Sequence, residues 1–414
     1  ENGSVRVSAQ YRDQDQSIDA ASGSMSDDEY EARAVGIRTD WDAGGQDRFT
    51  LQSDYQNLKK NNDIALHEDV AAAVPQFEED IGSDNANVLF RWQRPFSSGD
   101  SQEIQTYVDW TDRNESTYAY RRTTVDVDYQ YNLHQMAEHR LTTGLNYRYI
   151  ADHFEGTFAF DLGEPDLEYD QGTFFLQDEI SFSRQFATIL GVKLESTAVN
   201  EFEYQPTARF LWTPNDDLTL WTAVSRAIAT PSRAAQGITV RNGLPAATEA
   251  RIRQLAAIRF PTLVNGTVYG KLTGNEQYDS ESVTAYEIGY RHQITERLFV
   301  DATTYYNDYK NLRTFDARPA TVTLDVPNLA YTYVYNLTYG NKAEAHSTGF
   351  ELAANWAPLQ SWQLKLSYTY FNLVVDPDAG HDGLGAQELS DQSPMHQALL
   401  RSQHELGEQW EFDW

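Results

Sequence analysis

The chain has 414 residues, with 32 Lys and Arg against 62 Asp and Glu, so its formal net charge is −30, and it contains no Cys. The missing Cys excludes disulfide scaffolds, Cys-ligated zinc sites and thiol nucleophiles. The acidic balance and the absence of a basic patch argue against a nucleic-acid partner, because neutralising phosphates requires clustered Lys and Arg. With 25 Tyr, 19 Phe and 9 Trp, the composition is that of a folded protein.

The beginning of the chain gives no targeting signal. It starts at Glu1 and not at Met, and no apolar run approaches the ~18 residues that a transmembrane helix needs. We therefore expect the sequence to start after processing or inside a longer protein.

From the N-terminus onward, segments of about ten residues alternate apolar and polar side chains with a period of two. In the first segment Val5, Val7 and Ala9 share one face, while Arg6 and Ser8 share the other. The pattern recurs over 49–55, 87–93, 104–111, 124–132, 141–148 and 363–370. Such alternation is typical of strands that separate an apolar medium from a wet one.

The connections between about 17 candidate strands alternate strictly between short and long. The short ones are 42–47, 95–101, 133–138, 183–185, 213–217, 293–297, 357–361 and 405–409. The long ones are 13–29, 57–84, 112–120, 150–171, 194–204, 227–280, 307–346 and 374–393. All short turns then lie on one rim and all long loops on the other, which predicts an all-β, transmembrane, antiparallel up-and-down β-barrel.

Aromatic residues near strand ends, such as Trp41, Trp110 and Trp212, fit the interfacial girdles of such a barrel. The mean hydropathy of −0.61 fits a polar lumen and hydrophilic loops. A soluble β-rich carbohydrate-binding protein gives similar alternation and stays an alternative.

The long segment 227–280 and the one after it concentrate cations in an acidic protein: Arg233, Arg241, Arg251, Arg253, Arg259, Arg313 and Arg318. Helical spacing of apolar residues predicts a short helix over 247–258, above the barrel mouth. Cations and Tyr above a lumen suit an anionic, aromatic ligand, through charge-assisted hydrogen bonds and stacking. The alternative is that each arginine pairs with an acidic neighbour in the loops.

The first long loop is rich in carboxylates: Asp13, Asp15, Asp19, Asp27, Asp28 and Glu29. Asp13, Asp15, Asp27 and Asp28 could supply oxygen ligands for Ca²⁺. The alternative is a solvated acidic loop that at most bridges lipopolysaccharide through divalent ions. We expect no required cofactor.

The common catalytic motifs, Walker A, GxGxxG, HExxH and GxSxG, are absent. His134 and His139 flank a short turn and are more typical of a solvated turn than of a metal site. We therefore expect that the chain is not an enzyme.

Four segments carry a family resemblance. WTAVSRAIATPSR at 221–233 resembles the mid-barrel signature of TonB-dependent outer-membrane receptors. YEIGYR at 286–291, NKAEAHSTGFE at 341–351 and SPMHQALLRS at 393–402 follow in the family order. The resemblance is clear over 205–414, while 1–204 matches in pattern more than in motif.

The resemblance implies that 1–414 is the barrel domain of a receptor of the siderophore type, with about 17 of 22 strands present and with the plug domain and terminal strands absent from this chain. Trp410, Phe412 and Trp414 point the other way, because they alternate up to the last residue as in complete outer-membrane proteins.

By the same resemblance, the function is active uptake of a scarce nutrient, most often a ferric siderophore, across the outer membrane of a Gram-negative bacterium. The partners are then lipid and lipopolysaccharide, the iron chelate, and the TonB complex acting through the plug. A cobalamin receptor of the same family and a passive general porin are the alternatives. The ligand contacts are expected at Arg233, Arg241, Arg251, Arg253 and Arg313.

Overall fold

The computed structural model describes residues 3–18, 20, 23–26, 28–61, 66, 68–71, 81–197, 202–377, 393–407 and 410–414. Within these residues the chain forms twenty strands, all in one sheet, and three short helices. Three strands, β8 (Phe160–Asp161), β13 (Thr239–Asn242) and β14 (Asn265–Thr273), lie among the long connections.

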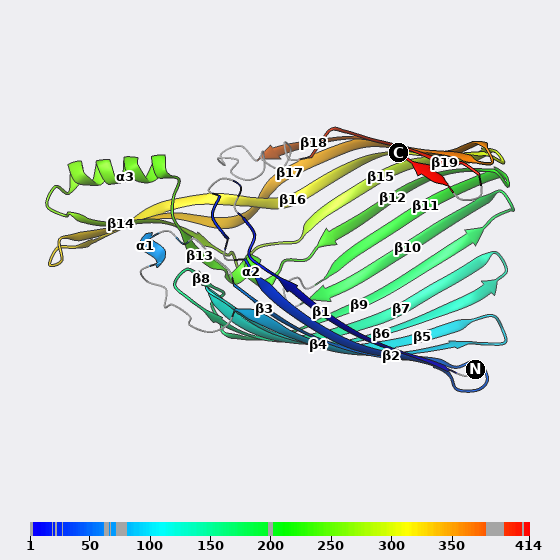
Figure 1. Cartoon of the computed structure of the whole chain (residues 1–414), viewed down its shortest axis with the longest axis horizontal. Helices are drawn as coiled ribbons and strands as arrows, with labels where there is room; N and C mark the ends of the chain where they lie inside the picture. Colours follow the sequence, from blue (N-terminus) through cyan, green and yellow to red (C-terminus); the bar gives the residue numbers. More distant parts are fainter. Residues whose placement is uncertain are drawn as a thin grey trace.

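The other seventeen strands form the curved wall of a barrel (Figure 1). They are β1 (Gly3–Gln14), β2 (Tyr30–Asp42), β3 (Arg48–Lys60), β4 (Gly82–Pro95), β5 (Ser101–Glu115), β6 (Tyr118–Met136), β7 (His139–Gly156), β9 (Asp166–Ser181), β10 (Phe186–Thr197), β11 (Glu203–Asn215), β12 (Leu218–Ala229), β15 (Glu281–Thr295), β16 (Leu298–Asp325), β17 (Ala330–Leu359), β18 (Trp362–Pro377), β19 (His396–Glu405) and β20 (Glu411–Asp413). Each pairs antiparallel with its neighbour in the wall. The predicted antiparallel up-and-down architecture is therefore confirmed.

Seven of the eight predicted short turns lie together on one rim, at the right in Figure 1, as predicted, and the eighth, 405–409, includes residues 408 and 409, which lie outside the described residues. Two of the predicted long loops are wrong. Residues 112–120 continue β5 and β6 and leave only Ser116 and Thr117 between them. Likewise β16 and β17 run through 307–346 and leave only 326–329 as a turn. Residues 307–346 are rich in Tyr, Thr and Val, which favour extended pleated structure over a loop, and 112–120 ends on two tyrosines, Tyr118 and Tyr120.

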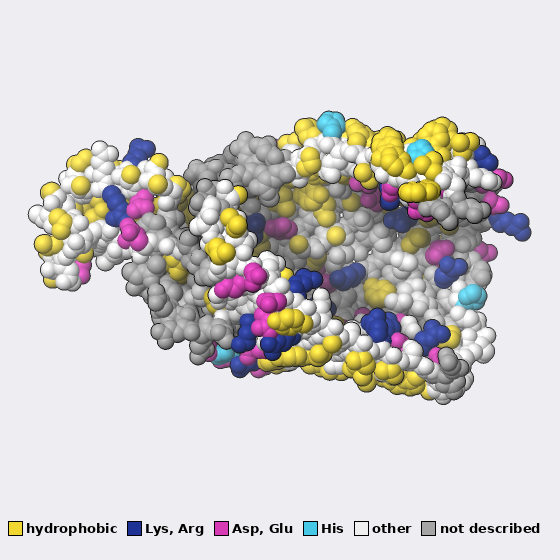
Figure 2. Space-filling view, viewed as in Figure 1, with side chains coloured by type: hydrophobic (Ala, Val, Ile, Leu, Met, Phe, Trp, Pro, Cys, Tyr) yellow, Lys and Arg dark blue, Asp and Glu magenta, His cyan; other side chains and the backbone are white. Residues whose placement is uncertain are grey.

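The two faces of the wall differ as the alternation predicts. On β6, Val127 is 43% exposed on the outer face, whereas its neighbour Asp126 points inward and is 2% exposed. Asp126 accepts hydrogen bonds from Arg148 Nε at 2.9 Å and from Asn146 Nδ2 at 3.1 Å. Figure 2 shows the same division, with hydrophobic side chains along the outer edges and charged ones in the hollow.

An arm extends from the rim with the long connections, at the left in Figure 1. We define the arm as α3 (Ala246–Arg259), β14 and residues 312–343 of β16 and β17. In it β14 pairs parallel with β17, from Asn265 opposite Ala330 to Thr273 opposite Thr338. The predicted helix over 247–258 is thus found, but it lies on the arm and not above the mouth.

The arm has a small core on each face of its sheet. On one face Leu263, Val268 and Tyr331 pack with Ile252 and Ala256 of α3. On the other face Tyr269 and Val334 pack with Val70 of α1 (Glu68–Ala71) and with Phe158 and Ala159. Among the residues that the structure describes, no helix is long and apolar enough to cross a membrane.

Candidate functional site

The helix α2 (Arg233–Gly237) places one predicted arginine against the inner wall of the barrel mouth. Ser232 caps the helix, its side chain accepting a hydrogen bond from the backbone N–H of Ala235 at 3.3 Å. The helix ends at Gly237, where a Cβ would come within 2.6 Å of the Leu162 carbonyl oxygen. Gly237 therefore lets the helix approach the segment around β8, which orients Arg233 toward β6 and β7.

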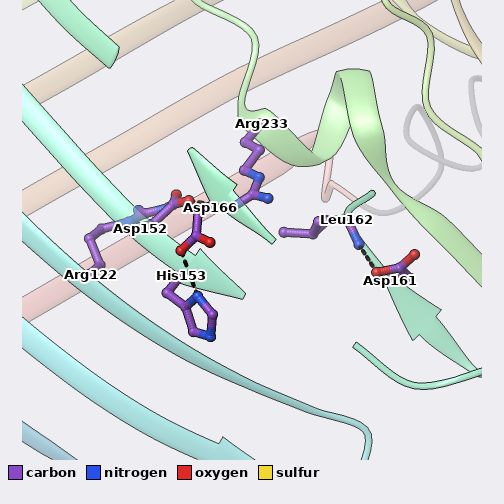
Figure 3. Close-up of polar contacts among 7 residues, drawn as sticks. All are labelled: Arg122, Asp152, His153, Asp161, Leu162, Asp166 and Arg233. Atoms are coloured by element: carbon purple, nitrogen blue, oxygen red, sulfur yellow. Dashed lines mark hydrogen bonds and ion pairs between the residues drawn. The ribbon is translucent and has the colours of Figure 1, made fainter. Parts of the chain in front are cut away.

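Arg233 meets a buried carboxylate there. Asp152 of β7 forms ion pairs with Arg233 and, at 3.1 Å, with Nη2 of Arg122 on β6 (Figure 3). The side chains of Asp152 and Arg233 are only 4% and 7% exposed. One carboxylate thus serves two guanidinium groups, so the three side chains carry a net positive charge.

The guanidinium groups are not saturated by this pairing. Nη2 of Arg233 and Nε of Arg122 are buried and have no hydrogen-bond partner among the residues that the structure describes. A buried, unpaired N–H of a charged group is costly, so both atoms are ready to bind an acceptor. Two donors in one place are suited to a carboxylate, phosphate or catecholate oxygen.

A cavity of about 190 Å³ adjoins this pair. Four aromatic rings line it, from Tyr118, Tyr120, Phe154 and Phe160. Tyr118 stacks on Phe154 with ring centroids 5.6 Å apart, and Arg122 and Arg233 each lie 6.0 Å from an aromatic ring centroid. The cavity therefore combines positive charge with flat apolar walls, as an aromatic anion requires.

The other predicted arginines do not converge on this cavity. Arg253 is fixed inside the arm by Glu249 and Asp69, each at 2.7 Å, and by the Gly266 carbonyl. Arg241 donates to the Phe158 carbonyl at 2.7 Å and lies over the Phe158 ring. Arg251 is exposed on α3. For Arg253 the structure supports the alternative of an arginine paired with acidic neighbours.

Arg313 lies on β16, at a different site. Its guanidinium is 5.7 Å from the ring centroids of both Phe315 and Tyr339. Its backbone N–H donates to Glu281, which also accepts a hydrogen bond from the hydroxyl of Tyr278 at 2.8 Å. Burial and this bond to Glu281 raise the pKa of Tyr278, so the phenol stays neutral.

The sequence pattern does not identify Arg122, Asp152, Tyr118 and Tyr120 as part of the site. The sequence pattern predicts a loop over 112–120, and it therefore gives the residues at the end of that segment no inward face. The available signal was the adjacent pair Arg121 and Arg122 directly after two tyrosines, in a chain with few cations.

The predicted calcium ligands are partly engaged. Asp28 accepts hydrogen bonds from the side chain and the backbone of Ser17, at 2.6 and 2.8 Å, and these bonds lower its pKa. Asp27 and Asp19 lie outside the described residues. No group of three or more His, Asp or Glu in the described ranges could hold a metal ion. Calcium binding by Asp13, Asp15, Asp27 and Asp28 stays a prediction.

Several solved structures share this fold. The siderophore receptor PirA from Acinetobacter baumannii superposes with a TM-score of 0.70 at 14% sequence identity, over 100% of this chain and 62% of that one. PirA from Pseudomonas aeruginosa gives 0.66 at 14% identity, over 99% and 69%. The copper transporter OprC gives 0.63 at 12% identity, over 98% and 61%. This chain thus spans less than two thirds of the length of the Acinetobacter PirA and of OprC.

At these identities the structural similarity establishes the fold alone, and a comparison with curated protein sequences gives no match. The family is established by sequence. Residues 1–412 match the family model described as TonB dependent receptor-like, beta-barrel. The proteins named above are receptors and transporters. The chain therefore belongs to the TonB-dependent receptor family, as part of its β-barrel.

Proposed function

We propose that this chain is the barrel of an outer-membrane receptor that captures an anionic metal chelate, most simply a ferric siderophore, for TonB-driven uptake. The observation that carries the proposal is the pair formed by the buried Arg233 and the partly exposed Arg122. They share one carboxylate, and within the described part of the chain two of their N–H groups have no partner beside an aromatic cavity.

An anion is the ligand that this site favours. Asp152 neutralises one of the two guanidinium groups, so a ligand oxygen that accepts from both would balance the second charge. The cavity walls are aromatic, and stacking on Tyr or Phe favours a flat ring over an aliphatic polyol. Catecholates and aromatic hydroxamates meet both conditions.

The wall fits a location in the outer membrane of a Gram-negative bacterium. Its outer face exposes large apolar side chains on nearly every strand, for example Val35, Val108, Val127, Phe210 and Leu366. Burying such a surface requires lipid or another apolar medium. The partners proposed here are therefore membrane lipid and lipopolysaccharide, the chelate, and the TonB complex. We assign the protein no enzymatic role.

Direct binding to the full-length receptor tests the proposal. We expect Arg122→Ala with Arg233→Ala to weaken binding of a ferric catecholate, hydroxamate or citrate complex by ~1–3 kcal/mol, because charge-assisted hydrogen bonds are lost. Arg251→Ala with Arg259→Ala is the matched control, since both arginines are exposed on α3. Unchanged binding in the first double variant, in a protein that still folds, would remove this pocket from the ligand site.

Growth experiments separate the rival cargoes. A siderophore receptor supports growth under iron limitation with a single siderophore, whereas a cobalamin receptor supports growth on cobalamin. Both assays are run with and without Ca²⁺, which also tests the predicted ligands Asp13, Asp15, Asp27 and Asp28. The siderophore assignment is refuted if growth on cobalamin requires calcium and if expression of the receptor does not respond to iron. A passive porin predicts solute entry that does not require TonB.

A further inference from the structure

The inner face of β18 changes its chemistry along the strand. The inward positions near the short-turn rim are polar, namely Gln363, Lys365, Ser367 and Thr369. The next three inward positions, toward the mouth, are Phe371, Leu373 and Val375, which pair with Gly349, Ser347 and Ala345 of β17. Three successive apolar side chains therefore face the interior of the barrel, whereas the other inward side chains of the strand are polar.

These side chains form one wall of a pocket of about 310 Å³. The pocket exists because the facing residues of β17 are small: Ala343 and Ala345 are almost fully buried. Tyr309, Leu312 and Phe315 of β16 complete the lining. Water gains little here, because most of the lining offers no hydrogen-bond partner. The pocket is therefore suited to an apolar chain.

The rim of the same pocket carries a cation. Arg313 and Glu281 are its two charged lining residues. Glu281 is already engaged, since it accepts from Tyr278 at 2.8 Å and from the backbone N–H of Arg313 at 3.1 Å. The Arg313 guanidinium stacks on Phe315 and Tyr339 and forms no ion pair within the described part of the chain. The rim therefore suits an anionic group, which would pair with Arg313, and the pocket suits an aliphatic group, which would pack against the apolar lining.

We propose that this pocket is a subsite for an aliphatic chain, so that the cargo of the receptor is amphiphilic: an anionic metal-chelating head with an acyl tail. This rests on the proposed function and narrows its substrate class. Arg313 at the rim of the pocket binds the anionic head, and the tail lies against Phe371, Leu373 and Val375. No covalent step is involved.

The test compares chelates that differ only in the tail. The full-length receptor is placed in lipid nanodiscs, because detergent tails would compete for the pocket. Binding is measured for ferric catecholate, hydroxamate and citrate-type complexes, each prepared with and without an octanoyl chain. Each methylene that enters the pocket is expected to tighten binding about fourfold. At least one head group should therefore show a preference of tenfold or more for its acylated form.

Two pocket variants and one control assign the preference to the pocket. Leu373→Gln places an amide in the pocket, and Ala345→Leu fills it. Both should reduce the preference to below about threefold and leave the affinity for the unacylated chelate unchanged. Ser367→Gln is the control, because Ser367 is an exposed inward residue of the same strand and does not line the pocket. It should keep the full preference.

The outcomes separate failure of the subsite from failure of the receptor. If chelates bind but acylated and unacylated forms bind equally, the subsite is refuted and the proposed function stands. The same holds if both pocket variants retain the preference. If Leu373→Gln lowers the unfolding temperature and weakens both forms alike, the pocket packs another part of the protein. If no chelate binds, the proposed function fails and the subsite fails with it.

Discussion

The barrel wall and the arm share two strands, β16 and β17, but their side chains face different surroundings. In the wall, one face of each strand is apolar and exposed while the other carries buried polar groups such as Ser347. In the arm, β14 and the part of β17 beside it are covered on both faces, by α3 on one side and by α1 and residues 158–159 on the other. A strand's side-chain pattern therefore reports what lies on each face, and it changes where the surroundings change.

The transition between the two regions is marked in the backbone. The pairing of β16 with β17 shifts between Tyr309 and Leu312, again before Thr314, and once more between Arg318 and Thr321. Asn311, within the first shift, has a positive φ of 58°. Such irregularities bend a strand and change which face a side chain meets. They let the same hydrogen-bonded pair leave the barrel and form the arm.

The largest expected difference between the two regions is the loss of stability when the same substitution, Val→Arg, is made in the wall and in the arm. Val127→Arg on the outer face of the wall should destabilise the full-length receptor by ~2–4 kcal/mol, because the charge enters the hydrocarbon. Val322→Arg, on the exposed part of the arm, should change stability by less than about 0.5 kcal/mol. The measurement is the free energy of unfolding in lipid bilayers. Equal losses would show that Val127 does not face lipid.

A cavity made in the core of the arm tests whether the arm unfolds separately from the wall. Val268 is fully buried between β14 and α3. Val268→Ala should cost about 2 kcal/mol, from the lost methyl groups and the space that they leave. We expect faster hydrogen exchange in β14 and unchanged exchange in the wall. Val264→Ala, at an exposed position of the preceding loop, is the control. If the wall amides exchange faster too, the arm and the barrel unfold together.

The smallest effect concerns pH at the outer end of β7. His153 hydrogen-bonds Asp166 at 2.7 Å (Figure 3). It also hydrogen-bonds Glu155 at 3.1 Å, and the two bonds raise the pKa of His153 above the ordinary value. The stabilisation is complete below the pKa of the unfolded chain, and it is lost as the pH rises through the raised folded value. Hydrogen exchange of the paired 153 and 166 amides, corrected for intrinsic rates, should therefore accelerate with rising pH. His153→Gln should abolish this dependence, and a dependence that survives in the variant would assign it to another group.

Most of the wall could be predicted from the sequence, whereas of the arm only the helix over 247–258 could be. Alternation such as Asp126 beside Val127 follows directly from two media on two faces, and short turns show in the connection lengths. The parallel pairing of Asn265 with Ala330 joins residues 65 positions apart and leaves no local pattern. For the same reason only Arg233 of the pocket was predicted, because its partners Arg122 and Asp152 come from other strands.

Inward residues are also less tolerant than alternation alone suggests. By pattern, Asp126 is a polar position facing a wet lumen, where a change of charge should matter little. In the structure it is almost fully buried and bonded to Arg148 and Asn146. Replacing it would strand a partly buried guanidinium, which costs more than a surface change.

Asp69 of α1 bears on the order in which the molecule folds. Its Oδ2 accepts hydrogen bonds from Arg253 at 2.7 Å and from the Val268 backbone N–H at 2.9 Å, residues 184 and 199 positions away in the chain. Bonds across such separations form only after the intervening strands have paired, because closing a long loop early costs entropy without local gain. The arm is therefore expected to mature last. During assembly its apolar residues stay uncovered for longest, so this is the part of the nascent protein that most needs a chaperone.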